Sequence, residues 1–455
     1  MNKAVDTRHP HAHAGGWVPR DQAHVARWVQ RLRQAVTRQP RPLVAPIAGL
    51  KALVEQDPLL HQQAQGMFDE AWQHEHSTPL GQVQVRSFDE FLQLLNGIMT
   101  TAPEAYQDVQ TQEPAGLIGF PINALLNWPM ATAAGYDFFA NALVNQQLRK
   151  ILGYWADFLQ SPASRYVLTE SVSPLDRQTL IVPWLGDVAK REMVKVAQGA
   201  LGAGDNPTPE RFEGIFHTVP GEEYEGFASW DDFFTRRFCP GVRPVTAPDD
   251  DSVIANACES APLQVVTGVR RQDAFWLKGQ PYSLDNLLDF DPRAAAFEGG
   301  TLYQAFLSAL SYHRWHSPVS GTVRSVKVVN GSYYLANRHQ GFDSPAGPDP
   351  SAPNQSQPFL TAVATRALIF IEADNPKIGL MCVVPVGMAE VSSCEVTVQP
   401  GQRIAKGEQL GMFHFGGSTH CLLFRPGVEL AFDFYGQQPG LEATNLRINT
   451  ALARV

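Results

Sequence analysis

"GMFHFGGSTH", residues 411–420, places two glycines and two hydroxyl side chains between an aromatic segment and a second apolar run. Glycine weakens a strand interior, so Gly416 and Gly417 indicate a bulge, a bend or a close approach of the backbone. One interpretation is a simple hairpin turn. The other is a backbone bond open to attack by Ser418, because Gly417 has no Cβ to shield its carbonyl carbon.

Short β-rich runs separated by Gly, Pro, Asn and Asp surround this stretch from about residue 240 onward. These runs are GTVRSVKVV (321–329), RALIFIEA (366–373), IGLMCVVPVG (378–387), CEVTV (394–398) and ELAFDFYG (429–436). The segment VTVQPGQRIAKGEQLG (396–411) has the hairpin pattern of lipoyl- and biotinyl-type sandwich domains. A swinging-arm carrier that uses Lys406 is disfavoured, because the flanking sequence of a modified lysine is missing. The region therefore predicts a β-rich domain that contains a sandwich-type hairpin.

The first third of the chain has the periodicity of helices instead. In DQAHVARWVQRLRQAV (21–36), apolar residues recur at three- and four-residue spacing and form one stripe. Ser87 and Glu90 have the spacing of a capping box before an apolar run. A long amphipathic helix is predicted from about Tyr136 to Gln160, after which SPAS breaks the pattern. The predicted fold class is α+β, a helical N-terminal region followed by a β-rich domain.

The composition is that of a globular protein, and it excludes several classes of partner. The 455 residues are 44% hydrophobic and 18% charged, which suits a chain with a large core and two or more domains. The net charge of -9 offers no positive footprint for nucleic acid. The chain lacks a long unbroken apolar run and an apolar N-terminal h-region, so neither stable membrane insertion nor a secretory signal is expected.

The cysteine and histidine spacings bear on redox environment and metal binding. The five cysteines are scattered with no CxxC spacing, and this favours free thiols in a reducing, cytoplasmic environment. We therefore expect a cytoplasmic protein. His9, His11 and His13 occupy every second position near the N-terminus. A flexible segment over residues 1–20 is favoured there over a metal site.

A serine that attacks a peptide bond needs a base to take its proton and a carboxylate to orient that base. SYHRWHSPVSG (311–321) offers two histidines, His313 and His316. The same pair could ligate a metal, but the sequence offers no third ligand at a recognisable spacing, so no metal is predicted. Structural histidines remain the other alternative from the residues alone.

These motifs resemble a known family. HRWHSPVSG (313–321) followed by GMFHFGGST (411–419) resembles the phosphatidylserine decarboxylase family of pyruvoyl-dependent enzymes. Three further stretches look like family segments: FASWDDFFTRRFCPGVRPV (227–245), LKGQPYSLDNLL (277–288) and VVPVGMAEV (383–391). The resemblance spans Phe227 to the C-terminus, and the helical first half is similar to the subgroup that includes fungal L-tryptophan decarboxylases.

The resemblance implies that Ser418 is a self-cleaving serine. Attack on the Gly417 carbonyl, β-elimination and loss of ammonia would leave a pyruvoyl group at residue 418. The products would be a β chain of residues 1–417 and an α chain of residues 418–455. The pyruvoyl group would form a Schiff base with the substrate amine and act as the electron sink, so neither PLP nor a metal is implied.

Three further residues take roles from the resemblance. His316 matches the general base of self-cleavage, and His313 matches a histidine that handles protons in decarboxylation. Glu259, in ANACES, stands where the family has the aspartate of a DG pair. A glutamate can orient an imidazole as well, but its longer side chain keeps the acidic run Asp249–Asp251 as a rival.

The resemblance also suggests domains and a substrate. The expected division is a flexible terminus (1–20), a helical domain (21–165) and a decarboxylase domain (166–455). The expected substrate is a free L-amino acid, aromatic and tryptophan-like, and Arg314–Trp315 and Phe413–Phe415 are candidates to line its pocket. The alternatives are a phosphatidylserine decarboxylase that makes phosphatidylethanolamine and an inactive, non-cleaving binding module. The α and β fragments are expected to be each other's partners, and a homodimer is left open.

Overall fold

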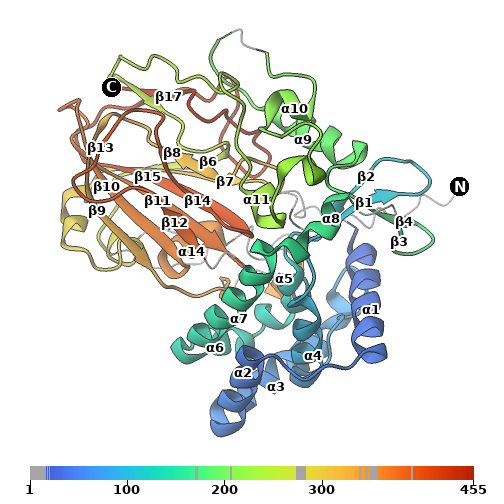
Figure 1. Ribbon diagram of the computed structural model, residues 1–455. Helices are drawn as coiled ribbons and strands as arrows, with labels where there is room; N and C mark the ends of the chain where they lie inside the picture. Colours follow the sequence, from blue (N-terminus) through green and yellow to red (C-terminus); the bar gives the residue numbers. More distant parts are fainter. Residues whose placement is uncertain are drawn as a thin grey trace, which may run out of the picture. The chain divides into compact units, whose positions relative to one another are not determined.

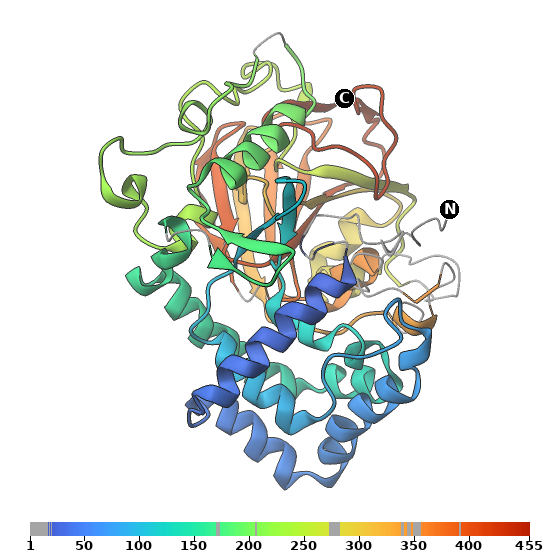
Figure 2. The ribbon, with the colours of Figure 1, turned by 90° about the vertical axis from the view of Figure 1, so that its right-hand side faces the viewer.

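The computed structural model has an α+β architecture (Figures 1 and 2). It describes residues 17, 19, 21–169, 173–204, 207–272, 283–337, 341–343, 347–348, 356–390 and 393–455. Contacts divide the chain into two compact units. Unit 1 contains the described residues of 1–189, 228–230 and 332–356, and unit 2 those of 190–227, 231–331 and 357–455.

Some of the predictions fall outside the described residues. The terminus 1–20 lies outside them except for Trp17 and Pro19, and His9, His11 and His13 are not described. The predicted domain boundary between residues 165 and 166 stays a prediction.

Unit 1 is mainly helical, as the periodicity predicted. The blue helices gather side by side in both ribbon views, with α3 packed on α6 and α2 on α7. The helices are α1 (Gln22–Arg38), α2 (Ala45–Gln56), α3 (Pro58–Gln73), α4 (Phe88–Ile98), α5 (Pro121–Leu126), α6 (Ala133–Ala140), α7 (Ala142–Gln160) and α8 (Tyr166–Thr169). Short 3-10 turns interrupt them at η1 (Glu75–Ser77), η2 (Pro129–Ala131) and η3 (Pro162–Arg165).

The predicted cap of α4 is confirmed. The Ser87 hydroxyl accepts a hydrogen bond from the backbone N–H of Glu90 at 3.2 Å. The Glu90 carboxylate reaches back one residue further than a standard capping box, to the backbone N–H of Arg86 at 2.9 Å. The first bond satisfies a donor that the first helical turn leaves without a partner, and the second satisfies the backbone N–H just before the N-cap.

Two features of unit 1 differ from the predictions. The expected helix over 136–160 is two helices, α6 and α7, because Asn141 is extended (φ -71°, ψ 126°) and caps α7 by accepting from Leu143 and Val144. Unit 1 also holds an antiparallel sheet, in the order β2-β1-β4-β3, that the sequence pattern missed. Its strands are β1 (Ala105–Asp108), β2 (Pro114–Leu117), β3 (Ser173–Pro174) and β4 (Thr179–Val182).

Unit 2 is built on a seven-stranded antiparallel sheet in the order β13-β9-β10-β11-β15-β7-β6. Its strands are β6 (Ala261–Thr267), β7 (Thr301–Leu307), β9 (Gly321–Val329), β10 (Arg366–Ala373), β11 (Leu380–Met388), β13 (Arg403–Ile404) and β15 (Gly417–Phe424). Figure 1 shows several of these strands side by side. We call it the large sheet.

Two three-stranded sheets complete unit 2. The first, which we call the small sheet, has the order β12-β14-β8 and contains β8 (Arg314–His316), β12 (Cys394–Val396) and β14 (Gln409–Phe413). The second has the order β16-β17-β5 and contains β5 (Val253–Ala255), β16 (Ala431–Phe432) and β17 (Ala451–Arg454). The remaining helices are α9 (Asp187–Gly199), α10 (Phe212–Ile215), α11 (Trp230–Phe234), α12 (Leu284–Leu287) and α14 (Gln357–Val363).

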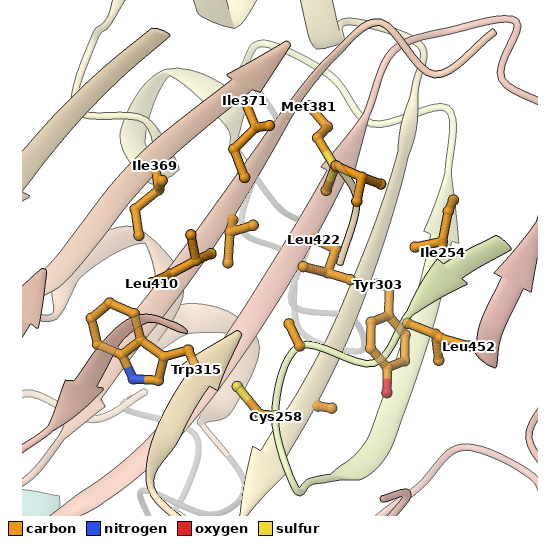
Figure 3. Packing of buried hydrophobic residues seen from close by; sticks show 14 of the residues in the cluster. Ile254, Cys258, Tyr303, Trp315, Ile369, Ile371, Met381, Leu410, Leu422 and Leu452 are labelled. Carbon is orange, nitrogen blue, oxygen red and sulfur yellow. The ribbon is translucent and has the colours of Figure 1, made fainter. Parts of the chain in front are cut away.

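Both faces of β15 are buried, which explains the apolar run Cys421–Phe424 at its end. Because alternate strand residues point to opposite faces, Leu422 and Phe424 join one buried cluster, and Cys421 and Leu423 join another. Figure 3 shows the first cluster, with Leu422 from the large sheet and Trp315 from the small sheet. The two sheets therefore share one core.

The strand predictions succeed where the apolar runs are long. The runs 321–329 and 366–373 are β9 and β10, and most of 378–387 is β11. The run 429–436 contains only the two residues of β16. The interpretation of Gly416–Gly417 as a hairpin turn is wrong, because β14 and β15 belong to different sheets and do not pair.

The two turns of the 396–411 segment are present as predicted. Gly401 and Gly407 have φ angles of 86° and 83°, a region that favours glycine. Lys406, which lies beside the second turn, is buried, and its Nζ donates to the carbonyls of Ala247, Asp250 and Val253 at 2.7–3.0 Å. A lysine held in this way is unsuited to carry a swinging arm.

Candidate active site

Strand β15 places Ser418 at its start, between β7 and β11. In the antiparallel register Ser418 lies opposite Leu307 on β7 and Gly387 on β11. Residues 418, 420 and 422 share one face of the strand, and Leu422 belongs to the cluster in Figure 3. The Ser418 side chain therefore faces the core shared by the large and small sheets.

The environment of Ser418 is unusual for a hydroxyl. Its side chain is 1% exposed, and its Oγ has no hydrogen-bond partner among the described residues. A buried polar atom without a partner costs free energy, so it calls for a functional explanation. Gly416, two residues earlier, has a φ of 134°, a conformation that favours glycine. The chain therefore bends at a glycine just before a serine that is desolvated and unbonded.

The two predicted histidines flank strand β8: His313 lies just before it, and His316 is its last residue. His313 precedes β8 and shares the face of Trp315, which is part of the Figure 3 cluster, whereas His316 has the opposite parity. The His313 ring stacks on Phe234 at 4.0 Å, and Phe234 contacts Phe415 edge-on at 5.3 Å. These ring contacts connect His313 to the segment just before Ser418.

His316 has a separate set of neighbours. Its Nε2 lies 3.2 Å from the hydroxyl of Tyr312, whose ring stacks on Phe238 at 4.4 Å. Burial lowers the pKa of His316 to about 4, although the Asn449 side chain favours the protonated form. Burial likewise holds the pKa of His313 well below its usual range, and the nearby Arg236 charge adds to this. Both imidazoles are therefore neutral at pH 7 and able to accept a proton.

The structure places Glu259 in an ion pair with an arginine. Both carboxylate oxygens lie within 2.6–3.1 Å of Nε or Nη2 of Arg243, and Oε2 also accepts from the backbone N–H of Ile448 at 2.8 Å. Arg243 and Glu259 are 3% and 2% exposed. The hydrogen bonds of the Glu259 carboxylate thus go to Arg243 and to the backbone of Ile448. The assignment of Glu259 as the acid that orients His316 stays a prediction.

The rival acidic run lies elsewhere and has a local role. Asp250 is exposed and accepts hydrogen bonds from the hydroxyl and backbone N–H of Ser252 at 2.6 and 3.0 Å. Its carboxylate also lies 3.3 Å from Arg454. These contacts describe a turn at the surface.

Sequence reasoning missed His414 and Tyr312. His414 Nδ1 lies 2.9 Å from Asp231 Oδ2, and its Nε2 lies 2.7 Å from Glu395 Oε2. No local pattern identifies this cluster, because Asp231 and Glu395 are 183 and 19 residues away along the chain. Tyr312 stands next to the histidine motif, and its place beside two histidines was the available signal.

A cavity of about 190 Å³ lies in unit 2, beside Arg314. It is lined by basic and acidic side chains together with Thr235 and apolar residues. The basic members are His217, Arg236, Arg237 and Arg314. Arg236 and Arg314 are buried, and burial lowers the pKa of Arg236 to about 9. The cavity is therefore suited to an anionic group.

Three further features of the described residues concern cysteines, metal ligands and apolar helices. All five cysteines are free thiols, as predicted. Within the described part of the chain, no group of three or more His, Cys, Asp and Glu side chains could hold a metal ion. In the same residues, no helix has both the length and the apolar character needed to span a bilayer.

The fold and the serine site agree with one family of enzymes. A family model described as phosphatidylserine decarboxylase matches residues 230–439, and a second with the same description matches residues 44–193. The chain belongs to the phosphatidylserine decarboxylase family and is a decarboxylase. The resemblance drawn from the sequence motifs is confirmed.

The relatives divide into two groups by coverage. Decarboxylase iboD of Amanita muscaria is 38% identical over 80% of this chain and 99% of its own length. The L-tryptophan decarboxylase of Psilocybe cubensis is 34% identical over 90% of this chain and 86% of its own. Phosphatidylserine decarboxylase proenzyme 3 of Schizosaccharomyces pombe is 29% identical over 45% of this chain and 19% of its own.

Proposed function

We propose that this chain is a pyruvoyl-dependent decarboxylase that cleaves itself between Gly417 and Ser418 and acts on a free aromatic L-amino acid. The observation that carries the self-cleavage is the Ser418 hydroxyl, buried without a hydrogen-bond partner among the described residues. It directly follows a glycine carbonyl and a backbone bend at Gly416. These groups suit the formation of a pyruvoyl group, which needs only a serine, an accessible carbonyl in the residue before it and a base.

The self-cleavage reaction balances with water as the only co-reactant. Ser418 Oγ bonds to the Gly417 carbonyl carbon while the Gly417–Ser418 C–N bond breaks, giving an ester and a free amine. Loss of the Ser418 α-proton and cleavage of the Cβ–Oγ bond release Gly417 as a carboxylate. Water then replaces the nitrogen, which leaves as ammonia, and residue 418 becomes the pyruvoyl group.

The histidines supply proton transfer in this proposal. His316 acts as the base that takes the Ser418 hydroxyl proton, and Tyr312 holds its Nε2. His313, which stacks on Phe234, handles the proton of decarboxylation. Burial keeps both imidazoles neutral at pH 7, so each can accept a proton there. The pyruvoyl carbonyl would supply the electron sink for the carbanion left by loss of CO2.

The fold supports continued association of the two fragments. After cleavage β15 would belong to the α fragment while it remains paired with β7 and β11 of the β fragment. The Ile448 N–H of the α fragment also donates to Glu259 of the β fragment. The fragments would therefore stay together as one folded unit.

The comparisons and the cavity favour an amino-acid substrate. Similarity to the Psilocybe cubensis enzyme covers 90% of the chain, whereas the Schizosaccharomyces pombe phosphatidylserine decarboxylase matches 45%. The cavity lined by Arg236 and Arg314 would attract a substrate carboxylate. Phosphatidylserine is the second candidate, because both family models carry its name.

Intact mass under denaturing conditions tests the self-cleavage. We expect two fragments, residues 1–417 and 418–455, with the second lighter by one ammonia than a chain that begins with serine. Ser418→Ala should give one uncut chain. Ser325→Ala, on β9, which lies three strands from β15 in the large sheet, should cleave normally. A single uncut parental chain would contradict the proposal.

A second assay tests the substrate. The mature protein is given carboxyl-labelled L-tryptophan, other aromatic amino acids or phosphatidylserine vesicles, and released CO2 is counted. We expect release from an aromatic amino acid and none from the Ser418→Ala protein. Turnover of phosphatidylserine alone would overturn the amino-acid assignment while it leaves the self-cleavage intact.

A further inference from the structure

His414 occupies a cradle of two carboxylates just before the proposed cleavage bond. Its Nδ1 lies 2.9 Å from Asp231 Oδ2 on α11, and its Nε2 lies 2.7 Å from Glu395 Oε2 on β12. An ionised carboxylate can only accept hydrogen bonds, so each ring nitrogen must donate one. An imidazole that donates from both nitrogens is protonated, and His414 is therefore a cation in this arrangement.

The charge of His414 distinguishes it from the other histidines near the site. Burial acts to lower the pKa of His414, but hydrogen bonds and charge attraction from Asp231 and Glu395 outweigh burial and raise the pKa to about 9. His313 and His316 are shifted in the opposite direction. Strand β8 of the small sheet contributes Arg314, whose charge is also attracted to Glu395.

The cradle lies at the N-terminal side of a short, well-anchored segment. The backbone N–H of Phe413 donates to the backbone carbonyl of His313 at 3.0 Å, and this bond fixes the start of the segment. At the other end Gly417 is paired with Met388 on β11. Only Phe415 and Gly416 lie between His414 and Gly417, and Gly416 carries the bend. A displacement of His414 can therefore reach the Gly417 carbonyl through only two intervening residues.

We infer that His414 is a positioning residue for self-cleavage: its cationic ring, held by Asp231 and Glu395, orients the Gly417 carbonyl for attack by Ser418. This inference rests on the proposed function. After cleavage His414 remains in the β fragment, four residues before Ser418 and three before the new carboxylate of Gly417. The cradle thus holds the C-terminal end of the β fragment, whose Gly417 carboxylate is the leaving group in β-elimination.

Loss of the His414 charge should have two kinetic consequences. Loss of the ring cation should slow ester formation, because the Gly417 carbonyl is no longer held toward Ser418 Oγ. A loosened ester should also be hydrolysed by water before elimination, and the α fragment would then begin with serine. The mass of that fragment separates the two products, since the serine form is heavier by one ammonia.

The experiment follows cleavage of newly synthesised full-length chains after a short pulse in a cell-free translation mixture, with the pH then set between 6.5 and 10. Three variants are compared with the parental chain: His414→Gln, His414→Arg and Glu395→Gln. We expect His414→Gln to cleave at least tenfold more slowly and to yield a serine-terminated fraction. His414→Arg, which keeps a cation with several donors, should recover to within about threefold of the parental rate.

The pH profile supplies a readout that a merely structural role would not change. The parental rate should fall as pH rises through about 9, because His414 then loses its proton. The His414→Arg variant should lack this fall, since guanidinium stays protonated there. His61→Gln, at an exposed histidine on α3 of unit 1, should match the parental profile.

The controls separate the failure of this inference from the failure of the proposed function. Uncut parental chains would overturn the proposed function, whereas normal parental cleavage with parental rates in His414→Gln would overturn only the positioning role. The same role is also overturned if His414→Arg is as slow as His414→Gln. Melting of each variant in a Ser418→Ala background checks folding. If His414→Gln fails to fold, the positioning role is tested with Glu395→Gln, which alters a half-exposed carboxylate. The cleavage rate and pH profile of that variant then decide whether the role holds.

Discussion

Replacement of Glu259 by glutamine is expected to destabilise unit 2, because it leaves a buried arginine charge without its partner. Arg243 and Glu259 are 3% and 2% exposed, and three contacts of 2.6–3.1 Å join them. Breaking a buried ion pair by removing one charge costs about 3–5 kcal/mol. For a unit of this size the same loss corresponds to a fall in Tm of roughly 6–20 °C.

The assay is urea unfolding in the Ser418→Ala background, in which every chain stays intact. Asp374→Asn is the matched control, because it breaks the exposed pair with Arg403, whose side chain is 66% exposed. Exposed pairs contribute less than about 1 kcal/mol, so this variant should unfold near the parental urea concentration. Glu259→Asp keeps the charge and should lose less stability than Glu259→Gln.

The result also decides between two roles for Glu259. Self-cleavage of Glu259→Gln is measured separately, in the chain that keeps Ser418. A large loss of unfolding free energy, with self-cleavage retained in the folded fraction of that chain, supports the ion pair as the function of Glu259. Unchanged unfolding with loss of self-cleavage would refute this reasoning, and it would support Glu259 as the acid that orients His316 in the proposed reaction.

Three other outcomes are expected. Leu422→Ala, in the core of Figure 3, should lower the free energy of unfolding by about 2–5 kcal/mol, measured by urea unfolding; a loss below 1 kcal/mol would show that the site collapses around the cavity. Self-cleavage should be insensitive to pH between 7 and 5 and should decline only as pH falls through about 4, because the neutral form of His316 persists down to that pH; a decline centred near 6.5 in fragment yield would contradict the burial of this base. Tyr312→Phe should slow self-cleavage several-fold without changing the melting temperature, and an unchanged rate would remove Tyr312 from the proposed machinery.

Several elements follow from local pattern, and the structure shows why. Ser87 and Glu90 form the cap that their spacing predicted, since a cap depends on atoms within one helical turn. Strand β10 matches its apolar run, because burial on both faces of a sheet favours an uninterrupted run of apolar residues. The break at Asn141 was missed because the flanking sequences share one amphipathic period while the Asn141 side chain caps the next helix.

The sequence by itself determined the class of fold, the family and the position of the serine, because these depend on periodicity and on residues adjacent in the chain. Tertiary structure alone decided which distant groups meet. It placed Glu259 on Arg243 and Ile448, and His414 between Asp231 and Glu395. Charge pairing and hydrogen bonding act through space over a few ångströms, while the residues they join here are separated by up to 189 positions, so no local pattern carries that information.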